Sequence, residues 1–352
     1  MRRNLLFASL LLFSGCLYAQ ALTIGEFIKA SSVPQKKFAG YLTREGFFRT
    51  NQYMNGDTMV QEFQLKEKRV SAIGDSATRF VQGLFYDNKS AFCYYTSSAE
   101  ESKNIIRKLK EEGFYCEGEA YLVPLLYQKN DITVKLGSKT EDSLQLYSFT
   151  IRKDELPAPK TIVFAEDFFG FNSHENLEYV FGKKNVQKDV YYLSDTDAVR
   201  CSVLFPNTER QVVFIWKDEL NRRCVSHLLI GNSLRNKKAT RDDQPFKENV
   251  WTLRNGLRAN MSLSELVKMN KGNFSFYGLK SPYAGVVVPD TKGSIDFKNT
   301  GVILSCLNCS NSQLMKQETV SADDAIENSE RVFILALIVM PQKQYEWTAF
   351  HR

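Results

Sequence analysis

The sequence predicts an α+β protein in which short helices pack on antiparallel sheets in two domains. The capping-box spacing Ser/Thr-x-x-Glu occurs at 23–26, 98–101 and 262–265, each time ahead of apolar residues at helical spacing. Segments that alternate between polar and apolar residues are separated by short turns, which is typical of hairpins rather than of a parallel sheet. With 25 Phe and 16 Tyr in 352 residues, the composition also favours strands.

The first part of the chain is expected to begin with a helix at Thr23. Its hydroxyl and the Glu26 carboxylate have the spacing that satisfies two backbone donors at a helix start. Ser98 and Glu101 predict a second helix, which should stop at Gly113 because glycine accepts a positive φ. A similar segment, in which a glycine is followed by aromatic residues, occurs after each helix, at 42–48 and 109–115. The first domain is therefore expected to hold two related helix-plus-sheet units. Strands are expected at 132–136 and 144–149.

The second part shows the same alternation of short helices and strands. One helix is expected from His174 to Phe181, ended by Gly182, and another should start at the capping box of Ser262. The apolar run 332–340 is followed by Pro341 and is too short for a membrane helix, which needs about 20 residues, so it is expected to be a buried strand. Further strands are expected at 186–193, 198–205, 211–216, 224–230, 273–277, 285–288 and 294–297.

Two domains are expected because 352 residues exceed a single typical core. The clearest internal break is the charged stretch 152–160, in which Pro157 and Pro159 disfavour a helix. A second polar stretch, 235–248, is interpreted as a surface loop. The predicted boundaries are 20–154 for the N-terminal domain, 155–160 for the linker and 161–345 for the C-terminal domain.

The first 19 residues have the pattern of an export signal. Arg2 and Arg3 precede a short apolar run, and the small residue Ala19 stands at an expected cleavage point. Cleavage after Ala19 is favoured and would release the protein into the periplasm or cell envelope. The stretch that ends at Cys16 also resembles a lipobox, in which Cys16 would be acylated and would anchor the protein to a membrane.

Six cysteines follow Cys16, and an even number in an oxidising compartment predicts disulfides. Pairing each cysteine with its nearest neighbour in the sequence would join Cys93 to Cys116, Cys201 to Cys224, and Cys306 to Cys309. Other pairings remain open, because proximity in the sequence is the only guide at this point.

The charge pattern argues against a nucleic-acid partner. Removing residues 1–19 deletes two arginines and no acid, so the formal net charge falls from +6 to +4. Lysines and arginines are interspersed with acids, as at 108–112 and 241–243, which is typical of a solvated surface rather than a phosphate-binding groove. No cofactor is expected, and a membrane contact is expected only through an anchor at Cys16.

The sequence contains no complete catalytic motif. It has three histidines and lacks the nucleophile elbow, Ser-x-x-Lys and His-Glu-x-x-His patterns. One motif, Cys306-Leu307-Asn308-Cys309, could support redox or metal chemistry. Two sulfurs at this spacing can bond to each other or to one metal ion. A structural disulfide is the preferred interpretation. A reactive disulfide is an alternative. A zinc site would need a second cysteine pair or nearby histidines, and the sequence has neither beside this motif.

Several phrases of the C-terminal half resemble a group of uncharacterised exported proteins of Gram-negative bacteria. The resemblance spans roughly 165–340 and implies a fold but no catalytic residues; it rests on phrases at 181–186, 204–206, 213–218, 251–257 and 262–266. In plan, helices followed by antiparallel sheets in tandem also resemble the beta-lactamase inhibitory protein and the small lipoprotein of the outer-membrane barrel-assembly machinery. Both of these act by binding other proteins, which implies a binding role by analogy of architecture.

The leading hypothesis is therefore an exported, non-enzymatic module that binds another protein through sheet faces and loops. Proteins of the inhibitor or immunity type are one class within this hypothesis. One alternative is a thiol-disulfide protein that uses Cys306 and Cys309. Another is a lipid-anchored structural component of the cell envelope, attached through Cys16.

Overall fold

The computed structural model of the chain describes residues 22–65, 77–86, 89–118, 125–141, 143–192, 198–231, 249–289, 293–307, 309 and 311–341. The expected signal at 1–19 with Cys16, and the expected loop at 235–248, lie outside these residues. The fold class is α+β with antiparallel sheets, as the sequence predicts. No helix within the described ranges is long and apolar enough to cross a bilayer.

The chain forms two compact units. The first consists of Met1–Phe114 and Thr133–Lys153, and the second of Tyr115–Ile132 and Asp154–Arg352. The later change of unit, between Lys153 and Asp154, lies at the end of the predicted N-terminal domain. The predicted domains are continuous, however, whereas here the segment Tyr115–Ile132 belongs to the second unit.

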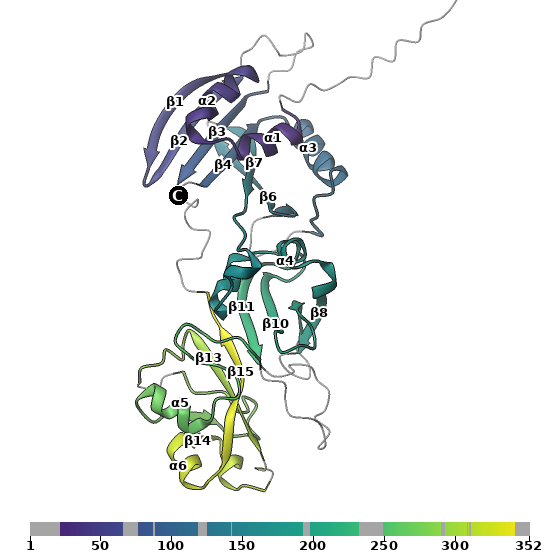
Figure 1. Cartoon of the computed structure of the whole chain (residues 1–352). Helices are drawn as coiled ribbons and strands as arrows, with labels where there is room; N and C mark the ends of the chain where they lie inside the picture. The colour runs from purple at the N-terminus through teal and green to yellow at the C-terminus, as the bar shows by residue number, and fades with distance from the viewer. Residues whose placement is uncertain are drawn as a thin grey trace, which may run out of the picture. The chain divides into compact units, whose positions relative to one another are not determined.

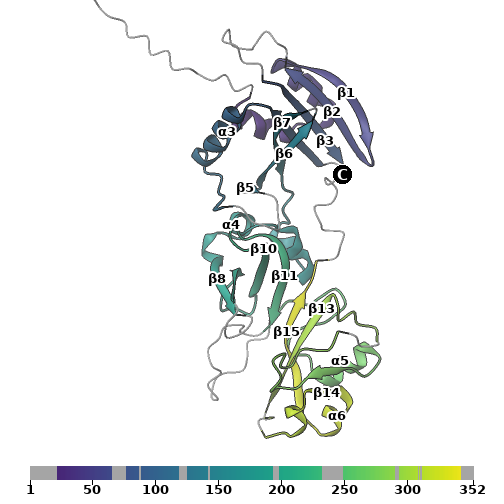
Figure 2. The ribbon, with the colours of Figure 1, turned by 180° about the vertical axis from the view of Figure 1, so that it is seen from behind.

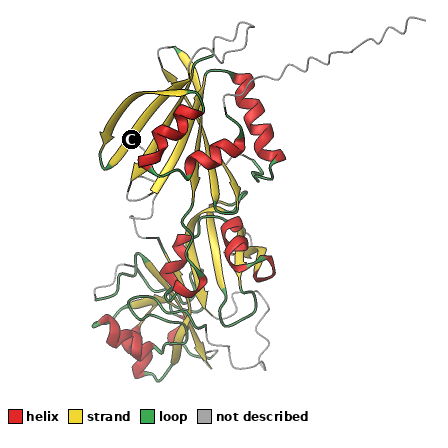
Figure 3. Cartoon of the chain, turned by 45° about the horizontal axis from the view of Figure 1, so that its top comes forward, coloured by secondary structure: helices red, strands yellow, loops and turns green. Residues whose placement is uncertain are grey.

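In the first unit, helices cover one face of an antiparallel sheet (Figures 1 and 3). The strands follow the spatial order β1-β2-β3-β4-β7-β6, so β7 pairs with β4 although it is the last strand of the unit in the sequence. The helices are α1 (Ile24–Ser31), α2 (Gln35–Arg44) and α3 (Ala99–Glu111). The strands are β1 (Phe47–Asn55), β2 (Thr58–Leu65), β3 (Arg79–Tyr86), β4 (Lys89–Thr96), β6 (Ile132–Glu141) and β7 (Leu144–Lys153).

Helix α2 is fixed to the sheet by one aromatic ring. Phe38 meets Phe63 and Phe85 edge-on, with ring centroids 5.7 and 5.2 Å away. The same ring fills the space above Gly83, where a Cβ atom would come within 2.4 Å of it. Because edge-to-face packing and the absence of a side chain both position the ring, the glycine sets how closely the helix approaches the sheet.

Helix α3 begins at the predicted cap but uses its glutamate differently. The Glu101 amide donates to Ser98 Oγ at 3.1 Å, as expected for a helix start. The Glu101 carboxylate turns toward the sheet instead of closing a capping box. It accepts hydrogen bonds from the hydroxyls of Tyr94 and Thr96 and from Arg79 Nε, each at 2.7 Å. The buried Arg79–Glu101 pair thus joins the helix to β3 and β4.

The two stretches in which the sequence suggests related helix-plus-sheet units do not form separate sheets. The strands of both stretches belong to the same sheet, with β4 hydrogen-bonded to β3 on one side and to β7 on the other. The helix that starts at the Thr23 capping box also ends early, at Ser31. Pro34 separates it from α2, since proline disfavours the helical conformation in the preceding residue.

The second unit contains an antiparallel sheet in the order β13-β15-β11-β10-β9-β8 and the short pair β12-β14 (Figure 2). Its sheet strands are β8 (Val186–Tyr192), β9 (Ala198–Leu204), β10 (Val212–Asp218), β11 (Arg223–Gly231), β13 (Thr300–Leu307) and β15 (Arg331–Val339). The other elements are β5 (Leu126–Lys129), β12 (Ser275–Tyr277), β14 (Thr319–Ser321), the helices α4 (His174–Phe181), α5 (Leu263–Asn270) and α6 (Ala322–Glu327), and the 3₁₀ turns η2 (Pro159–Thr161), η3 (Ala165–Gly170), η4 (Lys183–Asn185) and η5 (Leu314–Lys316).

Aromatic residues close the core of the second unit. Phe168 of η3 stands at right angles to Trp251, with ring centroids 4.8 Å apart, and also contacts Phe214 of β10 at 6.0 Å. The predicted buried strand at 332–340 is found as β15, which lies between β13 and β11. The expected strand at 294–297 is wrong; those residues form bends and turns, although Ile295 and Phe297 are buried.

Candidate functional site

The face of the first sheet that is turned away from the helices carries a cluster of polar and aromatic side chains. Side chains alternate between the two faces of a strand, so residues two apart share a face. Phe63 and Phe85 contact α2, which places the even-numbered residues of β2 and β3 on the opposite face. Tyr95 of β4 shares that face because it pairs directly with Phe80. We call this surface the open face; its central residues are Glu62, Gln64, Phe80, Gln82 and Tyr95.

Hydrogen bonds join four strands, β1 to β4, across the open face. Glu62 Oε1 accepts from Tyr53 Oη at 3.1 Å and from Gln82 Nε2 at 2.8 Å, and Tyr95 Oη donates to Gln82 Oε1 at 3.0 Å. Partial burial, followed by the charge of Glu62, raises the pKa of Tyr53. Burial raises the pKa of Tyr95 as well. Both phenols therefore stay protonated donors at neutral pH. Tyr53 holds the Glu62 carboxylate directly, and Tyr95 holds the Gln82 amide that donates to the same carboxylate.

An aromatic pair lies beside this network. The rings of Phe80 and Tyr95 stack with centroids 4.4 Å apart and an interplanar angle of 9°. Lys139 Nζ lies 5.8 and 5.3 Å from the two ring centroids and 2.8 Å from Glu141 Oε2. Both partners of this ion pair are about half exposed, with side chains at 46% and 55%, so it adds little stability and can be rearranged by a ligand.

These side chains border a shallow hollow of about 430 Å³. Two carboxylates and one ammonium group line it, so the hollow has a negative balance of charge. The rest of the wall combines one aromatic and two aliphatic side chains with four uncharged polar ones. The lining residues are Thr50, Glu62, Gln64, Thr78, Phe80, Gln82, Lys139, Glu141, Leu144 and Leu146.

The Cys306-x-x-Cys309 motif forms a second cluster, in the second unit. The structure joins the two cysteines in a disulfide at the end of β13. Cys309 is buried and Cys306 is half-buried. Glu330 Oε2 lies 2.9 Å from Cys309 Sγ, because the pairing of β13 with β15 brings the residue before β15 to the end of β13.

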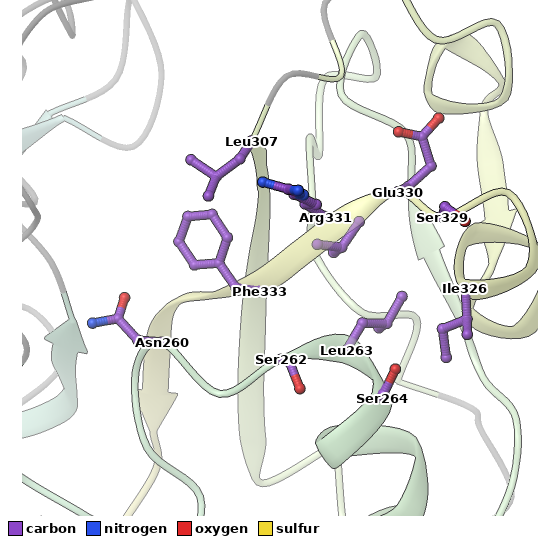
Figure 4. Close-up of a pocket in the computed structure, with 11 residues that line it drawn as sticks. Asn260, Ser262, Leu263, Ser264, Leu307, Ile326, Ser329, Glu330, Arg331 and Phe333 are labelled. Carbon is purple, nitrogen blue, oxygen red and sulfur yellow. The ribbon is translucent and has the colours of Figure 1, made fainter.

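Glu330 also lines a pocket of about 560 Å³ (Figure 4). Leu307, Arg331 and Phe333 from the two strands face the start of α5 across it. Leu307 lies between the two cysteines in the sequence, so the pocket borders the disulfide. The lining residues are Asn260, Ser262, Leu263, Ser264, Leu307, Ile326, Ser329, Glu330, Arg331, Val332 and Phe333.

The other two nearest-neighbour disulfides are not formed, because Cys93 and Cys224 carry free thiols. Cys93 belongs to the first unit and Cys116 to the second. Cys201 and Cys224 lie on β9 and β11, with β10 between them. Two strand spacings are about 9.5 Å, whereas a disulfide needs Cα atoms within about 7 Å. Proximity in the sequence is therefore a poor guide here.

The thiol of Cys93 should be protected from alkylation in the folded protein. Burial raises the pKa of Cys93 from 9.0 to about 11, which leaves about a hundredth of the usual thiolate at pH 8. We expect iodoacetamide at pH 8 to label Cys93 only after unfolding in urea, and peptide mass spectrometry will locate the label. Equal labelling with and without urea would contradict the buried thiol.

Ser202, His174 and Glu178 resemble a serine–histidine–acid chain. His174 Nδ1 lies 2.9 Å from Ser202 Oγ, and Glu178 Oε1 lies 3.4 Å from Nε2. Ser202 has no exposed surface, however, and its Oγ also accepts from Trp216 Nε1 at 3.0 Å. Burial lowers the pKa of His174 to about 3, so the ring is neutral. Because a substrate cannot reach the hydroxyl, this chain of hydrogen bonds is structural.

Comparisons of the chain with protein-family models, with curated proteins and with solved structures found no match.

Two features of the clusters could not be predicted from the sequence. Glu330 follows Cys309 by 21 residues, and no local pattern marks it as a neighbour. Lys139 approaches Phe80 only because β6 and β3 belong to one sheet. The alternation within each strand was the one available signal for the open face.

Proposed function

We propose that this protein is a non-enzymatic binding module and that the open face of its first unit binds a partner protein. The observation that carries the proposal is the combination, on a helix-free sheet face, of a stacked aromatic pair, a fixed carboxylate and a hollow of about 430 Å³. Tyrosine is among the residues that contribute most to protein interfaces. Such a face provides contact area without a reactive group.

The charge of the hollow favours a basic side chain of the partner. Glu62 and Glu141 supply two negative charges against the one positive charge of Lys139. Glu62 accepts two hydrogen bonds and, as a carboxylate, retains capacity for more. A guanidinium or ammonium group could pair with Glu62 while its aliphatic stem or planar head packs against Phe80. We therefore propose a protein loop with an exposed arginine or lysine as the occupant.

Thiol-disulfide exchange at Cys306 and Cys309 is the second candidate, and the pocket beside the pair favours it. The negative charge of the neighbouring Glu330 disfavours this exchange. Attack on Cys306 Sγ would release Cys309 as a thiolate, 2.9 Å from the Glu330 carboxylate. Like charges at this distance disfavour the thiolate and slow its departure. The binding role is therefore the better supported of the two.

Photocrosslinking will test the open face. Tyr53 is 39% exposed, so a photoreactive phenylalanine analogue at this position should crosslink one reproducible protein in an extract of the producing cells. We expect Glu62→Gln to weaken binding of that protein at least about tenfold, since a hydrogen bond to a charged group contributes about 1.5–3 kcal/mol. Binding should also weaken as salt rises.

Glu100→Gln is the matched control, because Glu100 is exposed on α3 and is not among the residues that line the hollow. It should bind like the wild type. Peptide mapping of the crosslink should place the partner's attachment close to an arginine or lysine. Unchanged affinity of Glu62→Gln, or equal crosslinking from a probe placed at Glu100, would contradict the proposal.

A further inference from the structure

The disulfide cluster contains the ligands of a transition-metal site. One ligand atom each from Cys306, Cys309 and Glu330 lies within 4.8 Å of the other two. Two sulfurs and one carboxylate oxygen are a donor set that suits Zn²⁺. The sequence offers the two sulfurs only; the third ligand comes from the strand pairing. We propose that the reduced form of this cluster binds one Zn²⁺ ion through these three side chains.

The backbone holds the three residues in position for a metal ion. Cys306 pairs with Val332 and Leu307 with Arg331 across β13 and β15, so Glu330 emerges beside the cysteine turn. The Cα atoms of the two cysteines are 5.7 Å apart, a spacing that a Cys-x-x-Cys turn keeps in either state. A tetrahedral zinc ion needs its sulfurs about 3.8 Å apart and each sulfur about 3.6 Å from the oxygen. The three ligand atoms lie within 4.8 Å of one another, a range that includes these separations.

Oxidation state decides whether the metal can bind. A disulfide has no negative sulfur to offer, so the bond must first be reduced: two molecules of a thiol reductant give up two electrons and two protons, leave as their own disulfide, and yield two cysteine thiols. Zinc then replaces the two thiol protons and is held by two thiolates and the carboxylate. The ion also relieves the repulsion between Glu330 and the sulfur beside it.

A three-ligand site leaves one coordination position for water or a ligand. Structural zinc sites usually have four protein ligands, whereas sites that bind exogenous groups keep one position open. Within the described residues, Cys306, Cys309 and Glu330 form the one group of this kind. The adjacent pocket of about 560 Å³, which Glu330 lines, gives a second molecule access to the neighbourhood of the ion.

Cobalt substitution will test the site. The whole protein is reduced with a phosphine, freed of reductant without air, and titrated with Co²⁺. We expect one ion per chain, with the near-ultraviolet thiolate-to-cobalt absorption and visible bands of a tetrahedral site. Zinc should bleach both, and binding should release two thiol protons per ion. No absorption from the reduced wild type, or equal absorption from the oxidised protein, overturns the proposal.

Variants separate this site from adventitious binding by the other cysteines. Cys306→Ser combined with Cys309→Ser should abolish the thiolate absorption. Glu330→Gln leaves both sulfurs and the strand pairing intact, and it should weaken cobalt binding about 10–100-fold. Glu327→Gln is the matched control, since Glu327 is exposed at the end of α6. Cobalt absorption that survives in the double cysteine variant overturns the proposal, and so does wild-type affinity in Glu330→Gln.

A redox titration gives a second readout that does not depend on spectra. If zinc binds only the dithiol, a free zinc concentration of a hundred times its Kd should shift the disulfide–dithiol equilibrium about 100-fold toward the dithiol. That shift corresponds to about 59 mV for a two-electron couple. An unchanged midpoint in the presence of zinc overturns the proposal. The site lies in the second unit, so its failure would leave the proposed binding role of the open face intact.

Discussion

Arg223→Met should destabilise the second unit by about 3–5 kcal/mol, because it leaves the Glu175 carboxylate, whose side chain is only 16% exposed, without its counter-charge. Arg223 has no exposed surface and lies 3.5 Å from Glu175, measured from Nη2 to Oε1. Its guanidinium also donates to the carbonyl oxygens of Leu126 and Tyr115, the latter at 2.6 Å. Burial already raises the pKa of Glu175, and Arg223 offsets part of that effect.

Urea unfolding followed by tryptophan fluorescence will measure this loss. Trp216 and Trp251 lie in the core of the second unit, and the first unit contains no tryptophan, so the signal reports on the second unit. We expect Glu175→Gln to recover about 1–2 kcal/mol when it is added to Arg223→Met. Arg331→Met, at an exposed position, should cost less than about 0.5 kcal/mol. A loss below about 1 kcal/mol for Arg223→Met would contradict the role of the pair.

Mild acid should destabilise the protein through His174. Burial, with smaller effects from Lys188 and Arg222, lowers the folded-state pKa of His174 to about 3, against 6.5 for an unperturbed histidine. Glu178 Oε1 is 3.4 Å from the ring and only partly buried, so it does not offset the burial. As the pH falls below 6.5, the unfolded state takes up a proton that the folded state cannot accept. The stability contributed by the neutral ring is thus complete above pH 6.5 and is lost on the way to pH 3.

The expected loss is about 2 kcal/mol between pH 8 and pH 5 from this one group. His174→Gln should remove that part of the pH dependence, whatever its own effect on stability. Burial lowers the pKa of His227 too, so a smaller dependence should remain. Urea unfolding at both pH values, for both proteins, checks this. If the variant loses as much stability as the wild type, His174 is not the group that titrates.

Local features were predictable from the sequence, since local contacts determine them. The amide of Glu26 donates to Thr23 Oγ1 and that of Glu265 to Ser262 Oγ, as their capping-box spacing predicts. Strand alternation and the antiparallel class follow from patterns within a few residues of each other. The fold class needed no information beyond them.

Long-range contacts were not predictable. Glu101 has the capping spacing, yet its carboxylate binds Arg79 of β3, 22 residues earlier in the sequence. The pairing of β4 with β7 merged two expected units into one sheet. Glu330 and Lys139 reach their sites through strand pairings that no local pattern encodes. Which strands become neighbours depends on loop closure and on the packing of whole faces, and a single sequence read in short windows contains neither.

The discontinuous division of the chain has a consequence for its biosynthesis. Leu126 precedes Arg223 by 97 residues and Tyr115 precedes it by 108, so both carbonyl groups leave the ribosome well before the guanidinium that binds them. At about 5–20 residues per second, the wait is about 5–20 s. All strands of the first unit have been synthesised by Lys153, and it can fold within that interval. During that interval the nascent chain therefore carries, between α3 and β6, a segment whose partners in the second unit have not yet been synthesised.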